Sequence, residues 1–122
     1  MKVVALDYGR ARTGVAVSDA TGTVARPVKV VDRVRSRAGR AALLETLREL
    51  APERVVVGLP LTLRGERGRQ AGETLAFVDE LRSACPVPVE TYDERFTSVL
   101  AGGDDARAAA HLLSGYLERR RG

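Results

Sequence analysis

The chain has 122 residues, a formal net charge of +4, and 18 arginines among its 20 basic residues. Its length predicts one domain, residues 1–122, and its arginine-rich balance is compatible with a nucleic-acid partner, because arginine binds phosphate in a bidentate manner. The lone Cys85 excludes an intramolecular disulfide and a cysteine-rich zinc site, and the lack of a signal peptide or a long apolar run predicts a cytoplasmic protein without a membrane partner.

The first quarter of the chain predicts three consecutive strands, over residues 2–8, 13–18 and 23–31. Short turns join them, so we expect an antiparallel meander. The first strand is apolar from Val3 to Leu6, and the acid Asp7 follows near its end. Because an ionised group is costly to bury, Asp7 either caps the turn, pairs with a partner or binds a metal ion.

The rest of the chain predicts helices that alternate with short strands. The helices cover residues 39–50, 66–84 and 105–120, and the strands cover residues 55–57 and 88–92. Three strands followed by two right-handed crossovers place the first strand in the centre of the sheet, with the fourth strand parallel beside it. The acid of the first strand then lies on the central strand.

Four motifs narrow this topology further. They are DYGRARTGVAVSD at residues 7–19, VGLPL at 57–61, DERFTS at 93–98 and DARAA at 105–109. In this order they closely resemble the YqgF family, also called RuvX, of RuvC-like Holliday junction resolvases that are also described as pre-16S rRNA processing nucleases. The resemblance implies an α/β, ribonuclease H-like fold: a five-stranded mixed sheet of order 3-2-1-4-5, with strand 2 antiparallel and helices on both faces.

The same resemblance implies that Asp7, Glu94 and Asp105 are catalytic residues that hold two Mg²⁺ or Mn²⁺ ions. Phosphodiester hydrolysis needs an activated water and a stabilised leaving oxyanion, which two such ions can supply, and hard cations prefer carboxylate oxygens. Simpler roles remain open. Asp105 suits the first turn of a helix by its charge alone, Glu94 suits a surface ion pair, and Asp93 is an alternative ligand.

Arginines surround these acids in the sequence. The glycine-containing loop 58–69 follows the fourth strand, at the end of the sheet where α/β folds place their ligands, and either receives phosphate or is a solvated turn. A second basic stretch, residues 33–40, is either a solvated connector or a phosphate-contacting patch. The expected nucleic-acid contacts are Arg12, Arg64, Arg67, Arg69 and Arg95.

Two conspicuous side chains have no expected part in the chemistry. His111 lies about 240° around its helix from Asp105, so it points away from the acid. Tyr8 follows Asp7 directly and points to the opposite face of the sheet, where packing is its expected role.

By this resemblance the chain is a metal-dependent nuclease for structured nucleic acid, either precursor 16S rRNA or a four-way DNA junction. A symmetric junction cutter needs two active sites and therefore a homodimer. The connector 96–104 is too short for the helix and basic loop found in the family, so we expect fewer substrate contacts while Glu94 and Asp105 still approach Asp7. Two other classes fit parts of the sequence: a catalytically inactive nucleic-acid-binding module, and an ATP-binding domain of the actin or sugar-kinase type.

Overall fold

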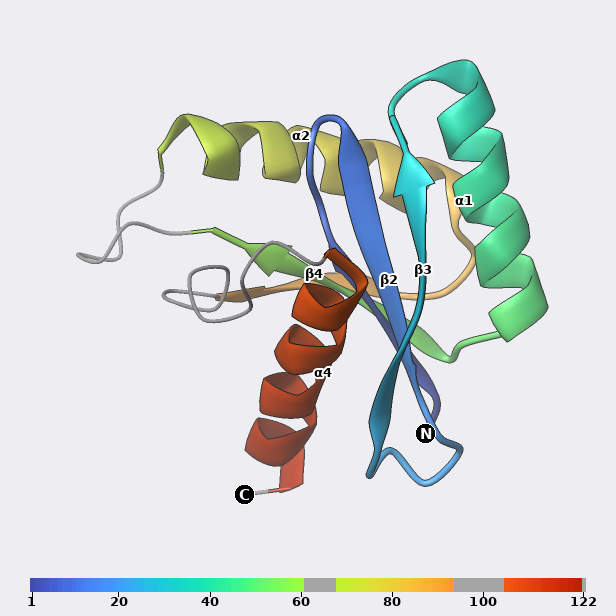
Figure 1. Cartoon of the computed structure of the whole chain (residues 1–122), viewed down its shortest axis with the longest axis vertical. Coiled ribbons are helices and arrows are strands. Elements are labelled where there is room, and N and C mark those ends of the chain that lie inside the picture. Colours follow the sequence, from blue (N-terminus) through green and yellow to red (C-terminus); the bar gives the residue numbers. More distant parts are fainter. Residues whose placement is uncertain (61–67, 94–104, 122) are drawn as a thin grey trace.

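The computed structural model describes residues 1–60, 68–93 and 105–121, with the backbone alone at 105 and 121 (Figure 1). Within these ranges the element order is the predicted βββαβαβα. The bounds are β1 Val3–Asp7, β2 Arg12–Ser18, β3 Ala25–Asp32, α1 Arg37–Leu50, β4 Arg54–Leu59, α2 Arg69–Ala84, β5 Val89–Asp93 and α4 Asp105–Arg121.

The strands form one five-stranded sheet in the order β3-β2-β1-β4-β5. β2 is antiparallel to both of its neighbours, whereas β1, β4 and β5 are parallel to one another. The predicted ribonuclease H-like order is therefore confirmed, with β1 in the centre. The carboxyl ends of β1, β4 and β5 consequently meet at one edge, which carries Asp7 and Asp93.

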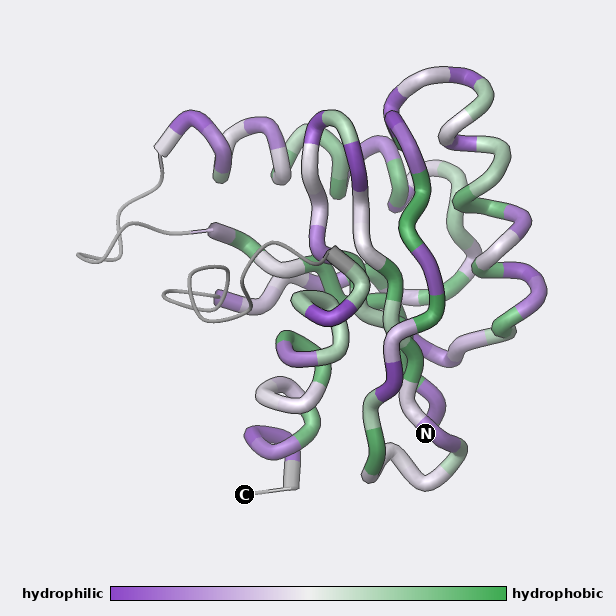
Figure 2. The backbone as a smooth tube through the Cα atoms, in the orientation of Figure 1, coloured by the Kyte–Doolittle hydropathy of each residue, from purple (hydrophilic) through white to green (hydrophobic). Residues whose placement is uncertain are grey.

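Alternate residues of β1 belong to two different cores, one on each face of the sheet. Val4 and Leu6 pack in the core that α1 and α2 cover, whereas Val3 and Ala5 pack against α4. Figure 1 shows α4 on one side of the strands and the other two helices on the opposite side. Figure 2 shows apolar strand segments between the helices and hydrophilic segments along the outer turns of α1 and α2.

The start of α1 depends on a close approach between two backbone segments. Ser36 caps the helix by accepting a hydrogen bond of 3.0 Å from the N–H of Gly39, so α1 begins two residues before the predicted position. Gly39 is buried against the carbonyl oxygen of Arg33, and a Cβ at residue 39 would overlap that oxygen. The glycine is therefore needed for space.

In the parts of the chain that the structure describes, none of the helices combines the length and apolar character needed to cross a membrane.

We predict that Gly39→Ala lowers the free energy of unfolding by about 1–3 kcal/mol, because the new methyl group must displace packed backbone. Gly72 is the matched control, since it is also helical but exposed, and a methyl group added there would meet no packed neighbour within 4 Å. Gly72→Ala should stabilise the protein by about 0.5–1 kcal/mol. Urea unfolding of both variants measures the difference, and equal stabilities would contradict the close approach at residue 39.

Candidate active site at the carboxyl edge of the sheet

Asp7 ends the central strand and lies at the boundary between core and solvent. Val3 to Leu6 are fully buried, whereas Asp7 is half-buried and pairs in register with Gly14 of β2. Since side chains alternate along a strand, Asp7 has the same parity as Val3 and Ala5 and belongs to the α4 side of the sheet.

The first residue of α4 has the matching helical position. Residue 105 precedes Leu112 by seven positions and Tyr116 by eleven, and both of these side chains are buried in the core between α4 and the sheet. Residues separated by seven or eleven positions share one side of a helix. The backbone of α4 therefore begins with residue 105 on the stripe that faces the sheet.

The end of β5 determines the face of one candidate acid, Asp93. Val89 packs in the core under α1 and α2, whereas Glu90 and Tyr92 contact Tyr116 of α4. By the same alternation Asp93, which is exposed, belongs to the face opposite Asp7. The parity of the strand thus disfavours Asp93 as a ligand beside Asp7.

Several predicted site residues lie outside the described residues. They are Glu94, Arg64, Arg67, Arg95, the connector 96–104 and the side chain of Asp105. Over the described ranges, no cluster of three or more His, Cys, Asp or Glu side chains could hold a metal ion. The approach of Glu94 and Asp105 to Asp7 therefore remains a prediction.

The turn after Asp7 is fixed by a buried hydroxyl that sequence reasoning missed. The N–H of Gly9 donates to Oγ1 of Thr13 over 3.4 Å, and that hydroxyl lies 3.3 Å from the carbonyl oxygen of Gly9. Thr13 is fully buried, and a Cβ on Gly9 would overlap the carbonyl oxygen of Arg12. The sequence did contain a signal for this hydrogen bond, because Thr13 begins the predicted second strand shortly after the turn at Gly9.

A hollow of about 510 Å³ lies between the end of β1 and the first turns of α2, and we call it the Asp7 hollow. Arg69, one of the predicted arginines, borders this hollow together with Asp7. The cap of α2 is Gly68, which supplies no side-chain hydrogen bond. Backbone N–H groups at such a helix start are suitable donors for phosphate oxygens. The residues that line it are Asp7, Tyr8, Gly9, Arg10, Pro60, Arg69, Gln70, Glu73 and Thr74.

Four other side chains, three near the turn and one on α4, can be compared with the sequence analysis. Tyr8 stacks on Phe77 of α2 with 4.7 Å between ring centroids, which confirms its packing role on the face opposite Asp7. His111 is exposed on α4, and Arg12 is exposed at the start of β2. Arg10, which was not predicted, forms an ion pair with Glu73 beside the Asp7 hollow.

The second basic stretch is partly held by an acid from α2. Arg35 and Arg40 both form ion pairs with Glu80. Two of the four arginines in the stretch 33–40 are therefore held in ion pairs. The hydrogen bond from Arg35 lowers the pKa of the Glu80 carboxyl and outweighs the opposing effect of burial. The stretch is therefore anchored to the helix that borders the Asp7 hollow.

A lowered carboxyl pKa stabilises the folded state above the ordinary glutamate value, and this contribution is lost as the pH falls through the lowered pKa. We predict that Glu80→Gln reduces the free energy of unfolding by about 0.5–1 kcal/mol near pH 7, and by much less near pH 3. Urea unfolding across this pH range measures the effect. Glu45→Gln, which removes one exposed pair with Arg48, is the control and should cost less. A loss that is independent of pH would contradict a role for the Glu80 charge.

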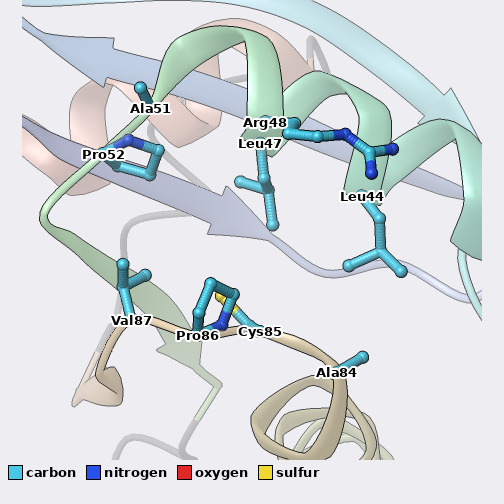
Figure 3. Close-up of a pocket in the computed structure, with 9 residues that line it drawn as sticks. All are labelled: Leu44, Leu47, Arg48, Ala51, Pro52, Ala84, Cys85, Pro86 and Val87. Atoms are coloured by element: carbon cyan, nitrogen blue, oxygen red, sulfur yellow. The ribbon is translucent and has the colours of Figure 1, made fainter.

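A second hollow lies at the opposite end of the sheet and differs in chemistry (Figure 3). It has a volume of about 360 Å³ and is bordered by the segments that precede β4 and β5. Its lining is mostly apolar, with Arg48 and Cys85 as its ionisable side chains and no carboxylate. This hollow lacks the groups that hydrolysis of a phosphodiester requires.

Solved structures define the class of fold. The chain is similar to Thermus thermophilus RuvC in complex with a Holliday junction substrate, with a TM-score of 0.61 and 24% identity over 100% of this chain and 96% of that chain. It is also similar to the fowlpox virus Holliday junction resolvase, with a TM-score of 0.59 and 11% identity over 98% and 99% of the two chains. At these identities the likeness establishes the fold, which is that of RuvC.

Sequence relatives define the family. The family model described as "RuvX: Holliday junction resolvase" matches residues 1–119, and the chain belongs to this family. A protein of Chloroflexus aurantiacus named "Putative pre-16S rRNA nuclease" is 40% identical over 98% of this chain and 88% of its own length. A protein of Anaeromyxobacter with the same name is 39% identical over 98% of each chain. The alignment with the Chloroflexus protein has 134 positions, more than the 122 residues of this chain, so it contains gaps.

Proposed function

We propose that this chain is a metal-dependent nuclease that hydrolyses phosphodiester bonds in structured nucleic acid, within one domain that spans residues 1–122. One observation carries the proposal: a half-buried acid, Asp7, ends the central strand on the sheet face where α4 begins with Asp105. Membership of the RuvX family supports the same activity.

Three acids form the proposed catalytic set: Asp7, Glu94 and Asp105. Asp93 belongs to the face of the sheet opposite Asp7, and this supports Glu94 rather than Asp93 as the partner of Asp7. Position 105 lies on the sheet-facing stripe of α4. Asp7 and position 105 therefore belong to the same face of the sheet.

The chemistry of these donors fits Mg²⁺ or Mn²⁺. All three side chains offer carboxylate oxygens, which hard divalent cations prefer, and the one histidine of the chain is exposed on α4. Bound as a pair, such ions supply an activated water and stabilise the leaving oxyanion. Asp7, Glu94 and Asp105 would hold the ions.

The basic residues at this edge bind and orient the substrate. Arg69 and the N-terminus of α2 border the Asp7 hollow and suit the phosphate next to the bond that is cut. Arg12 is exposed beside the same turn, and Arg64, Arg67 and Arg95 are the further proposed contacts. Contacts of this kind fix the position of the backbone without reading the base sequence.

The substrate is either precursor 16S rRNA, as the names of the relatives suggest, or a four-way DNA junction, as the family description suggests. Cleavage of both labelled substrates by the purified protein, with Mg²⁺, Mn²⁺ or EDTA, tests the proposal. Cutting of the junction on two strands would also require a homodimer, which sedimentation measures. ATP binding without cleavage would instead favour an ATPase domain, and nucleic-acid binding without cleavage an inactive module.

Asp7→Asn should abolish cleavage, by a factor of about 10³ or more, while the fold and most of the binding remain, because the change removes one charge without a change of volume. Cleavage assays, circular dichroism and binding titrations measure these three properties. Asp93→Asn is the matched control, because Asp93 is exposed on the other face, and it should cut at the wild-type rate. Wild-type cleavage by Asp7→Asn would refute the assignment.

The loop arginines generate a separate prediction about salt. Replacing Arg64, Arg67 and Arg69 with alanine should weaken binding to duplex DNA and reduce the slope of log K against log salt by about 0.9 per lost contact, or about 3 in total. The control replaces three exposed cations on other elements, Arg26, Lys29 and Arg48. An unchanged slope in the loop variant would identify the loop as a solvated turn.

A further inference from the structure

A third hollow lies beside the Asp7 hollow, between α2 and the connection from β3 to α1. It has a volume of about 660 Å³, and it shares Tyr8, Arg10 and Glu73 with the Asp7 hollow. Figure 1 shows the β1–β2 turn between the start of α1 and the helix α2 at this end of the molecule. We call this hollow the arginine groove; its lining residues are Tyr8, Arg10, Ala11, Arg33, Arg35, Ser36, Glu73 and Glu80.

In two ion pairs of the arginine groove the arginine is more exposed than its glutamate. The side chain of Arg10 is 77% exposed and its partner Glu73 only 27%. Arg35 is 41% exposed and its partner Glu80 31%. The ion pair engages Nη2 of Arg10, and a guanidinium has five N–H donors, so the outer side of this group can bind a further anion.

The backbone of the groove is held in an unusual conformation. Arg33 has a φ of 43°, in the left-handed region that a non-glycine residue seldom adopts. Its N–H donates to the carbonyl oxygen of Ala11 over 2.9 Å, and its own carbonyl oxygen accepts hydrogen bonds from the N–H and the hydroxyl of Ser36. Residues held in such conformations cluster at binding sites, and here the contact joins the β1–β2 turn to the connection from β3 to α1, both of which line the groove.

We propose that the arginine groove binds the sugar-phosphate backbone of the nucleic-acid strand that extends from the Asp7 hollow. Arg10, Arg33 and Arg35 contact its phosphates. This inference rests on the proposed nuclease function and extends it to a second binding surface. Glu73 is a positioning residue, which holds Arg10 at the mouth of both hollows and competes with phosphate for it.

The lining favours backbone recognition over recognition of bases. Its projecting groups are guanidinium groups, whose planar fork suits the oxygens of a phosphate, and its aromatic ring, Tyr8, is already stacked on Phe77. A strand bound here therefore contributes affinity that depends on salt and not on sequence.

The test compares binding of a fluorescent four-way junction by the wild type, Arg10→Ala and the Arg10→Ala, Arg35→Ala double variant, all in EDTA over a series of salt concentrations. Each lost contact should lower the slope of log K against log salt by about 0.9, so the double variant should bind about one to two orders of magnitude more weakly at 0.1 M salt. Arg48→Ala is the matched control, because Arg48 is 72% exposed and also pairs with a glutamate. It should retain the wild-type slope.

A third variant separates binding from folding. Glu73→Gln removes a competing charge, so it should bind the junction more tightly than the wild type at low salt, a change that damage to the fold cannot produce. If the double variant does not fold, Arg10→Ala alone decides the outcome, since its side chain projects into solvent. Wild-type slopes in the arginine variants, or no gain in Glu73→Gln, overturn the groove assignment.

The outcomes also distinguish the groove from the nuclease. Wild-type protein that binds and cuts nucleic acid, together with arginine variants of unchanged slope, refutes the groove and leaves the nuclease intact. Wild-type protein that neither binds nor cuts any nucleic acid refutes both proposals. Arginine variants that bind nucleic acid normally but lose an acidic protein partner would assign the groove to that partner and overturn the proposal.

Discussion

The burial of β1 on both of its faces is the constraint on which the rest of the molecule depends. Four successive residues, Val3 to Leu6, are fully buried, so the strand cannot shift by one position without moving apolar side chains into the wrong core. This fixed register assigns Asp7 to the α4 face. The position of the acid is thus determined by the apolar residues that precede it. Asp7 is the first residue of β1 that is not fully buried on both faces of the sheet.

Helix α2 connects the core to the charged edge of the sheet. Its buried Phe77 stacks on Tyr8, while Glu73 and Glu80 hold arginines that come from the β1–β2 turn and from the connection between β3 and α1. One helix therefore contributes apolar packing on one side and the acids that order basic groups on another. The proposed substrate-binding residues Arg10 and Arg35 are ordered by ion pairs that span 63 and 45 residues of sequence, so their placement depends on the completed fold.

The elements could be predicted from the sequence because their patterns are local. The valines of β4 and the apolar spacing of the helices indicate their structures within a few residues of chain. The roles of Gly39 and Arg10 could not be predicted, since each depends on a contact that the sequence pattern does not show: a carbonyl oxygen near the helix start and an acid 63 residues away. The acid set was predicted by resemblance, and the parity of β5 disfavours Asp93 as the alternative to Glu94 in that proposal.

The hydrogen bond between Arg33 and Ala11 has a consequence for the kinetics of local motion. The Arg33 amide proton can exchange with solvent only when the β1–β2 turn separates from the connection that follows β3. In the protein without nucleic acid, the exchange rate of this amide therefore measures the free energy of that local opening. A strand lying across both segments would slow this single amide without altering the amides of β1, whose exchange requires the sheet itself to open.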